Sequence, residues 1–232
     1  MAQVRSSNIG LIRNESIIMK NLIIVGARGW GREVYMAAIT CPAYYKQKAY
    51  EVKGFLDTDM SLFDGMRGIY PPILGSPEDY QIEKDDVFFV AMGDPQWRRY
   101  YAEMLEKKGA QFQTIICEGA FVNPSALIGA GGFVACWANV SDNVKIGMHS
   151  VVHPYANIGH DVLIGDYVTI ESYCFVGGKA KIDDDSTMHV RSTLIRHKSI
   201  GKHVEVGAHS LVMRSIKDGE HVFGIPAQKI EY

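Results

Sequence analysis

The sequence lacks the features of several protein classes. None of its apolar runs approaches the roughly 20 residues that a membrane-spanning helix needs, and residues 1–20 contain no uninterrupted apolar segment of the kind found in secretory signals. Its four cysteines are widely spaced and form no CxxC pair. With a net charge of −2, the chain has no excess of lysine and arginine for nucleic-acid phosphates. We therefore expect a cytoplasmic protein with free thiols, no membrane insertion and no nucleic-acid partner.

A six-residue repeat fills the second half of the chain. From Val122 to Val212, every sixth residue is aliphatic or methionine at sixteen successive positions, and glycine often follows directly, as at Gly129 and Gly165. This period does not fit an α-helix, whose apolar positions recur every three to four residues. Each hexapeptide predicts a short strand and a turn, and three of them form one triangular coil of a parallel β-helix. We expect about five coils, with residues 18 apart stacked in columns. An antiparallel sandwich would need the spacing to arise by coincidence.

The first half alternates strand and helix signals. The run NLIIV predicts a buried strand, GARGWG follows as a glycine-rich loop, and REVYMAAIT is helix-like. Further strands are expected over 50–57, 86–92 and 112–116, and a further helix over 95–109. This alternation predicts a small, Rossmann-like α/β domain with a parallel sheet.

These patterns divide the 232-residue chain into three parts, and its 47% of hydrophobic residues can fill one or two cores. We expect residues 1–19 to be a poorly ordered extension, because the first strand begins directly after them. Residues 20–118 are expected to form the α/β domain. Residues 119–232 are expected to form the hexapeptide domain, which ends in a cap around GIPAQKI.

The glycine-rich loop suggests an anion-binding site. Its glycines are Gly26, Gly29 and Gly31, in the pattern GxxGxG rather than the dinucleotide fingerprint GxGxxG. The loop puts backbone amides at a helix N-terminus, where unpaired N–H groups and the helix dipole favour a phosphate. Asp57 ends the second strand, where a carboxylate could accept hydrogen bonds from a nucleotide base or sugar. The alternative is a tight turn that needs small residues, with a strand-end acid beside it.

Several motifs together resemble one family. They are the glycine-rich loop, the FLD and VAMG strand ends, the hexapeptides with the pair His160 and Asp161, and the GIPAQK tail. In combination they resemble the sialic-acid O-acetyltransferase and UDP-N-acetylbacillosamine N-acetyltransferase family, over nearly the whole chain from Lys20. The resemblance implies a left-handed β-helix and a homotrimer with active sites between subunits. It also implies acetyl-CoA as the donor and an N-terminal domain that holds a nucleotide-sugar.

The resemblance also implies roles for particular residues. The catalytic histidine falls on His160 and its acidic neighbour on Asp161. The implied substrate contacts are Arg28, Gly29, Trp30, Asp57 and Gly93. The implied acetyl-CoA contacts, mainly through backbone groups, are Thr169, Gly178, Val190 and Ala208. Thr169 departs from the family, which has a second histidine nine residues after the first; this puts in doubt how the acetyl carbonyl is held, although a threonine hydroxyl could donate to it.

Arg28 and Trp30 are bulkier than a minimal glycine loop requires. Arg28 could pair with a phosphate, because its planar guanidinium matches phosphate oxygens. Trp30 could stack on a base or a sugar. Both could equally be surface residues.

His160 suits the role of a general base. An amine attacks a thioester only as the neutral nitrogen, and an imidazole with an ordinary pKa of about 6.5 accepts the released proton near neutral pH. A carboxylate beside the ring would orient it. The column rule places Asp142 one coil below His160 and Gly178 one coil above, where glycine leaves room for a thioester and a backbone amide could hold the oxyanion. Asp142 is thus a second candidate to orient the ring, because Asp161 could point to the opposite face.

Other classes of function fit parts of the sequence. His153, Glu171 and His189 would form one column, as in a zinc-dependent β-helix hydratase. Coils are about 4.8 Å apart, so the two histidines would be about 9.6 Å apart, too far to share zinc without Glu171 or a partner subunit, and we expect no metal. An NAD-dependent oxidoreductase would be expected to carry GxGxxG. A catalytically silent scaffold would not depend on His160.

The sequence as a whole favours an acetyl-CoA-dependent acetyltransferase. We predict that it N-acetylates an amino group of a nucleotide-linked amino-deoxy-sugar for surface glycan synthesis. O-acetylation of a sugar such as sialic acid is the alternative within this class.

Overall fold

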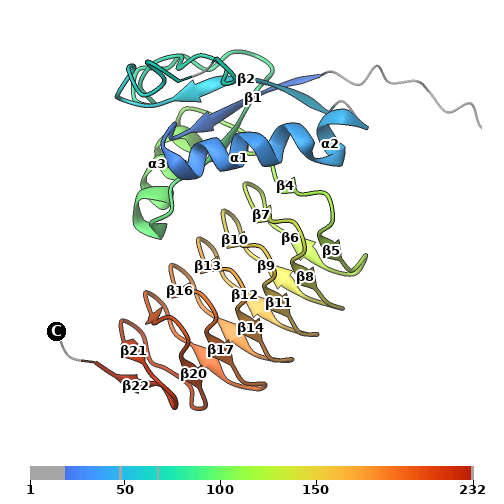
Figure 1. The fold of residues 1–232 in the computed structure, drawn as a ribbon, viewed down its shortest axis with the longest axis vertical. Helices are drawn as coiled ribbons and strands as arrows, with labels where there is room; N and C mark the ends of the chain where they lie inside the picture. Colours follow the sequence, from blue (N-terminus) through green and yellow to red (C-terminus); the bar gives the residue numbers. More distant parts are fainter. Residues whose placement is uncertain (1–18, 47–48, 67, 231–232) are drawn as a thin grey trace, which may run out of the picture.

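The structure is a computed structural model that describes residues 19–46, 49–66 and 68–230. These residues form an α/β unit with a three-stranded parallel sheet, followed by a parallel β-helix (Figure 1). The predicted fold class is confirmed. Of the expected extension over 1–19, residues 1–18 lie outside the described residues. Within the described ranges, no helix combines the length and the apolar character needed to cross a bilayer.

The α/β unit is built around a strand that is buried on both faces. β1 (Lys20–Val25) lies between β2 (Tyr50–Leu56) and β3 (Asp86–Val90), parallel to both. Alternate side chains of a strand point to opposite faces, so Leu22 and Ile24 pack with α1 (Gly29–Thr40), and Ile23 and Val25 pack with α3 (Pro95–Lys107). Burial on both faces explains why β1 is a continuous apolar run. A short helix, α2 (Pro42–Tyr45), follows α1.

Each coil of the β-helix contributes one short strand to each of three parallel sheets. The first sheet contains β4 (Ile115–Ile116), β7 (Phe133–Val134), β10 (Val151–Val152), β13 (Thr169–Ile170), β16 (Thr187–Met188), β19 (Glu205–Val206), β21 (His221–Phe223) and the antiparallel β22 (Gln228–Lys229). The second contains β5 (Phe121–Val122), β8 (Asn139–Val140), β11 (Asn157–Ile158), β14 (Phe175–Val176), β17 (Thr193–Leu194) and β20 (Leu211–Val212). The third contains β6 (Leu127–Ile128), β9 (Lys145–Ile146), β12 (Leu163–Ile164), β15 (Lys181–Ile182) and β18 (Ser199–Ile200).

The β-helix has about six turns, one more than expected. The sequence count began at Val122, but β4 already pairs with β7 in the register of the later coils. The predicted strand over 112–116 is therefore divided: Phe112 forms a bridge to Phe88 of the α/β unit, and Ile115–Ile116 opens the β-helix. The chain passes from one unit to the other within these few residues.

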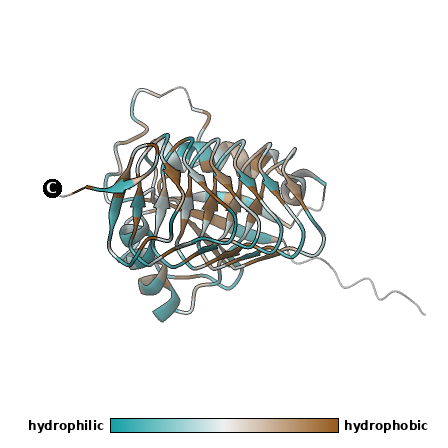
Figure 2. Cartoon of the chain, turned by 90° about the horizontal axis from the view of Figure 1, so that it is seen from below, coloured by the Kyte–Doolittle hydropathy of each residue, from teal (hydrophilic) through white to brown (hydrophobic). Residues whose placement is uncertain are grey.

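The repeated aliphatic positions fill the interior of the β-helix, as predicted. Val140, Ile158 and Val176 are fully buried in one column, and apolar segments recur from coil to coil (Figure 2). The turns between the strands place a residue in the left-handed conformation once every six residues, at non-glycine positions such as Asp161 and Tyr167. This conformation redirects the side chains at the corners of each coil, where the candidate catalytic residues lie.

The α/β unit packs directly on the first sheet of the β-helix. Val34 and Ala38 of α1 share a core with Phe133, Ala135 and Val151. Figure 1 shows α1 and α3 on the side of the α/β unit that faces the strands β7, β10, β13 and β16. This packing creates the interdomain cleft described below.

Candidate active site

His160 and Asp161 form the turn between β11 and β12, and their side chains contact each other. Nδ1 of His160 lies 2.8 Å from Oδ2 of Asp161. Asp161 has a φ of 58°, so its side chain turns toward the preceding residue; neighbours alternate faces only in extended strands. The alternative in which Asp161 points away from the ring is therefore wrong. With a carboxylate at Nδ1, the neutral imidazole carries its proton there, and Nε2 keeps a free lone pair.

The carboxylate of Asp161 is held from a second side. Its Oδ1 accepts a hydrogen bond of 2.8 Å from Nδ2 of Asn143, and the contacts with His160 and Asn143 lower the pKa of Asp161. Asp142, the second candidate to orient the ring, has a different partner: its Oδ1 accepts a hydrogen bond of 2.6 Å from Ser125. In the structure, Asp161 and not Asp142 contacts the imidazole.

Gly178 lies one coil above His160, as the column rule predicts. The backbone N–H of Lys179 donates to the carbonyl of His160 at 2.9 Å. A Cβ added to Gly178 would lie 2.7 Å from Nε2 of His160. Nε2 therefore faces the space that the glycine leaves free. The histidine side chain is 60% exposed, so a ligand can reach this space from outside the β-helix.

The glycine-rich loop joins β1 to α1 and is closed by Asp57. One oxygen of this carboxylate accepts the N–H of Ala27 at 2.9 Å, and the other accepts the amide two residues further along the chain. A Cβ on Gly31 would come within 1.8 Å of the carbonyl oxygen of Gly26, so the loop requires glycine there. Helix α1 starts at Gly29 with no side-chain cap and no acidic residue in its first turn. Its N-terminal amides are thus available to an anion.

Two clefts lie beside this loop. The first, which we call the loop cleft, has a volume of about 500 Å³ and is lined by four of the five expected substrate contacts, Arg28, Trp30, Asp57 and Gly93. The second, the interdomain cleft, has a volume of about 830 Å³ and includes the fifth, Gly29. It runs from the glycine loop and the start of α3 to the first sheet of the β-helix. Trp30 and Gly93 line both clefts, so the structure gathers all five positions.

Trp30 also packs between the two units. Its ring meets Phe133 edge-on, with centroids 5.2 Å apart, and lies 4.8 Å from the ring of His153. Trp30 is half-buried, so it is not the plain surface residue of the alternative interpretation. Arg28 is exposed at the rim of the loop cleft.

The expected acetyl-CoA contacts fall on different edges of the β-helix. Gly178 lies at the corner that holds His160, whereas Val190 and Ala208 stack at the corner between the first and second sheets. The N–H of Val190 donates to Glu171 at 2.8 Å. That N–H is therefore already engaged within the chain, and the contact of Val190 with acetyl-CoA stays a prediction. Thr169 starts β13 and lines the interdomain cleft.

His160 and Thr169 lie on opposite sides of the β-helix. They are nine residues apart, and a coil contains 18, because Val151 pairs with Thr169 in the next coil. Half a coil of separation turns two side chains away from each other. His160 lines neither the loop cleft nor the interdomain cleft. A single chain therefore does not bring the histidine to the expected substrate contacts.

The column of His153, Glu171 and His189 lines the interdomain cleft and does not lie on an open outer face. Glu171 is 3.2 Å from Nδ1 of His189 and also accepts the N–H of Val190. This pairing raises the pKa of His189 and lowers that of Glu171, whereas burial lowers the pKa of His153. In the described ranges, no group of three or more His, Cys, Asp or Glu side chains is arranged to hold a metal ion.

Arg98 is a candidate functional residue that sequence reasoning missed. It is 1% exposed and lines the interdomain cleft. It lies on the same face of α3 as Ala102 and Leu105, four and seven residues later, both of which are buried. An arginine on the apolar face of the predicted helix was the signal that could have found it.

The fold of the second half is that of a hexapeptide-repeat β-helix. Comparison with known families agrees, because residues 143–178 match the family "Bacterial transferase hexapeptide (six repeats)". More particularly, residues 21–105 match the "PglD N-terminal domain". The chain thus joins a PglD N-terminal domain to hexapeptide repeats, which confirms the resemblance to the sugar acetyltransferase family. No curated protein matches the sequence significantly.

Solved structures share the whole architecture. The acetyltransferase domain of PglB from Neisseria gonorrhoeae is 27% identical with a TM-score of 0.79, over 91% of this chain and 100% of that domain. PerB from Caulobacter crescentus, solved with CoA and GDP-perosamine, is 22% identical with a TM-score of 0.81, over 91% and 97% of the two chains. WeeI from Acinetobacter baumannii is 23% identical with a TM-score of 0.79, over 91% and 100%. At these identities, the last two show the fold alone.

Proposed function

We propose that the protein transfers the acetyl group of acetyl-CoA to an amino group of a nucleotide-linked amino-deoxy-sugar. The observation that carries this proposal is the His160 turn: Asp161 occupies Nδ1, and Nε2 faces the space beside Gly178. That arrangement is suited to a general base that works on a ligand at the surface of the β-helix. The PglB domain supports the choice of donor, because it has also been solved with acetyl coenzyme A.

The reaction needs no acyl-enzyme. The amine nitrogen attacks the thioester carbon, the C–N bond forms, and the C–S bond breaks. Nε2 of His160 accepts the proton that the amine loses, and this proton can pass to the departing CoA thiolate. Asp161 keeps the ring in place and stabilises the imidazolium that forms. A backbone amide near Gly178 stays the proposed contact for the oxyanion.

The acceptor occupies the loop cleft and the interdomain cleft. Its diphosphate lies at the uncapped start of α1, where Arg28 adds a positive charge at the rim. Asp57 accepts the N–H of Ala27 and so holds the glycine-rich loop in place beside the nucleotide site. The sugar then points toward the interdomain cleft through the wall shared by Trp30 and Gly93.

The charge of the interdomain cleft favours an amine over sialic acid. The side chains that line it include five carboxylates, those of Glu33, Asp94, Glu171, Asp185 and Glu205, together with four histidines and one guanidinium, that of Arg98. Three of the carboxylates are paired, Glu171 with His189, Glu205 with His221 and Asp185 with Arg99. Glu33 and Asp94 have no ion-pair partner among the described residues and give the cleft its excess negative charge. An amino-sugar arrives largely as an ammonium ion and is attracted by this lining. Sialic acid carries a carboxylate and is repelled. O-acetylation of sialic acid therefore stays the alternative with less support. Whether a neutral sugar hydroxyl is acetylated instead is tested by the hydroxyl analogues in the assay below.

A homotrimer would complete the site. His160 and Thr169 face opposite sides of one chain, so they can act on the same thioester only if they come from two copies. We propose that the partner subunit's His160 approaches the interdomain cleft of its neighbour, and that acetyl-CoA lies in the groove between them. Gly178 would then contact the coenzyme from one copy, and Ala208 from the other. The cytoplasmic location expected from the sequence stays a prediction.

The test is CoA thiol release from acetyl-CoA with a panel of UDP-, GDP- and dTDP-linked amino-sugars, their hydroxyl analogues and free sialic acid. We expect one nucleotide amino-sugar to be turned over, and His160→Gln to lower kcat by roughly 10²- to 10⁴-fold, which is the usual range for a general base. Full activity in His160→Gln would remove the histidine as the base. Turnover confined to hydroxyl acceptors would replace N-acetylation by O-acetylation. If no acceptor is acetylated and acetyl-CoA does not bind, the protein would be interpreted as a catalytically silent scaffold.

A further inference from the structure

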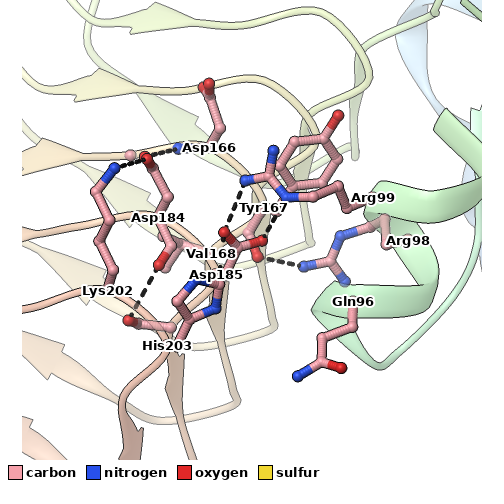
Figure 3. A network of polar contacts seen from close by, with 12 residues as sticks. Gln96, Arg98, Arg99, Asp166, Tyr167, Val168, Asp184, Asp185, Lys202 and His203 are labelled. Carbon is pink, nitrogen blue, oxygen red and sulfur yellow. Dashed lines mark hydrogen bonds and ion pairs between the residues drawn. The ribbon is translucent and has the colours of Figure 1, made fainter. Parts of the chain in front are cut away.

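Arg98 joins the α/β unit to the β-helix through four hydrogen bonds. Its Nη1 donates to the carbonyls of Met92 at 2.8 Å and Gly93 at 3.3 Å. Its Nη2 donates at 2.8 Å both to the carbonyl of Tyr167 and to Oγ1 of Thr169. The guanidinium thus ties the end of β3, where the loop cleft begins, to the start of β13. Figure 3 shows the side chain of Arg98 reaching from α3 toward Tyr167.

The chemistry of this contact determines what Thr169 can do. A hydroxyl that accepts from a guanidinium still has its own proton to donate. No hydrogen bond donated by Oγ1 of Thr169 is found among the described residues, and Thr169 lines the interdomain cleft. A charged donor on the oxygen also polarises the O–H bond and strengthens it as a donor.

The position of the charge is unusual for an arginine. Arg98 is almost completely buried. Within residues 19–46, 49–66 and 68–230, no carboxylate hydrogen-bonds to it and its Nε has no hydrogen-bond partner. Burial lowers its pKa to about 10, against the nearby charges of Asp185 and Asp94. Burying a guanidinium on four neutral oxygens costs free energy that a methionine or leucine would avoid. A role that needs a fixed charge at this place explains the arginine better than packing does.

We propose that Arg98 is a positioning residue that fixes the hydroxyl of Thr169 as a hydrogen-bond donor to the acyl oxygen of the thioester. The inference rests on the proposed acetyl transfer and assigns one step of it. As the amine adds to the carbonyl carbon, the C=O electron pair moves to oxygen, and the Thr169 O–H stabilises the negative charge. When the C–S bond breaks, the carbonyl forms again, and the proton of Thr169 has not left its oxygen. The pair of Arg98 and Thr169 thus supplies one donor to the oxyanion, in addition to any backbone amide.

A neighbouring arginine offers a matched control. Arg99, the next residue of α3, makes two hydrogen bonds of 2.9 and 2.7 Å to Asp185 and lies over the ring of Tyr167 at 4.1 Å. It also joins α3 to the β-helix, and Figure 3 shows it beside Asp185 and Tyr167. It lines neither cleft, and no hydrogen bond between Arg99 and Thr169 is found in the part of the chain that the structure describes. A variant at Arg99 therefore weakens the docking of α3 without touching the hydroxyl.

The experiment measures kcat and KM of the full chain for its best nucleotide amino-sugar. We expect Thr169→Val, which keeps the shape but lacks the hydroxyl, to lower kcat by about 10²- to 10³-fold, the usual loss for one oxyanion donor, with little change in KM for the sugar. Thr169→Ser should recover most of the rate. Arg98→Met should lower kcat when it is introduced into the wild type. In a protein that already carries Thr169→Val, the same substitution should change kcat less than about threefold, because Arg98 and Thr169 act through the same hydroxyl proton. Arg99→Gln should keep kcat.

The outcomes separate this inference from the proposed function. If the wild type acetylates an amino-sugar and Thr169→Val keeps its kcat, the proposed function stands and the role of the hydroxyl is overturned. If Arg98→Met and Arg99→Gln lower kcat equally, the role of Arg98 is only to hold α3 against the β-helix. Should Arg98→Met fail to fold, the comparison of Thr169→Val with Thr169→Ser still decides the matter. A wild type that is silent with every acceptor would remove the basis of both proposals.

Discussion

His149 should make the protein sensitive to mild acid. Its side chain lies at a corner of the β-helix and is 3% exposed, stacked on Tyr167 with centroids 5.1 Å apart and in edge contact with Phe112 at 4.5 Å. Its Nδ1 has no hydrogen-bond partner among the residues that the structure describes. Burial, together with the charges of Arg98 and Arg99, lowers the pKa of His149 to about 4. The folded protein therefore holds a neutral imidazole.

The sign and the size of the effect follow from this shift. An unfolded histidine has a pKa of about 6.5, so below that pH the unfolded chain binds a proton that the folded chain refuses. The contribution of His149 to the free energy of unfolding is complete above pH 6.5 and is lost as the pH falls from 6.5 to about 4. A difference of about 2.5 pKa units corresponds to about 3 kcal/mol in total, of which about 2 kcal/mol is lost by pH 5.

The assay is urea unfolding of the wild type and of His149→Phe at pH 7.5 and pH 5.0, at one fixed protein concentration. Phenylalanine keeps an aromatic ring between Tyr167 and Phe112 but cannot take up a proton. Other groups titrate in the same interval, so the quantity to compare is the loss of unfolding free energy in each protein. We expect the variant to lose about 2 kcal/mol less than the wild type. Equal losses, within about 0.5 kcal/mol, would refute the assignment of this acid sensitivity to His149.

Three further predictions concern the catalytic turn and the glycine loop. Asp161→Asn should lower kcat more than Asp142→Asn, because Asp161 contacts the imidazole; the reverse order in a thiol-release assay would restore Asp142 as the orienting residue. Gly178→Ala should lower kcat with little change in melting temperature, because the added Cβ would lie 2.7 Å from Nε2 of His160 while the backbone tolerates alanine; a variant with full kcat would show that this space is not used. Gly31→Ala should lower the melting temperature and weaken nucleotide-sugar binding in calorimetry, because the Cβ would collide with a loop carbonyl at 1.8 Å; unchanged binding would place the nucleotide elsewhere.

Sequence reasoning reached the elements whose signals are local or periodic. The six-residue period predicted the coils, and the interval of 18 correctly placed Gly178 above His160, because stacking in a β-helix follows the chain. The run NLIIV and the glycines of the loop predicted β1 and the turn into α1 in the same way. The extra coil was missed because Ile115–Ile116 lies before the unbroken part of the repeat.

Other features depended on conformation or on distant contacts. The left-handed φ of Asp161 turns its carboxylate onto the ring, and the strand rule of alternate faces cannot describe a turn. The engagement of the Val190 amide by Glu171 depends on a contact between coils that the repeat alone does not specify.

The sequence by itself determined the β-helix, the parallel sheet and the glycine-rich loop, because each is encoded within a few residues or by a fixed period. The choice of His160 as the candidate base came from the resemblance to a family and stays a prediction. Only the tertiary structure decided how the two units meet. The interdomain cleft exists because α1 packs on the first sheet. Arg98 reaches Thr169 across 71 positions of the chain because α3 docks beside β13. Such contacts join residues that no local pattern or repeat connects, and they depend on the packing of whole elements against each other.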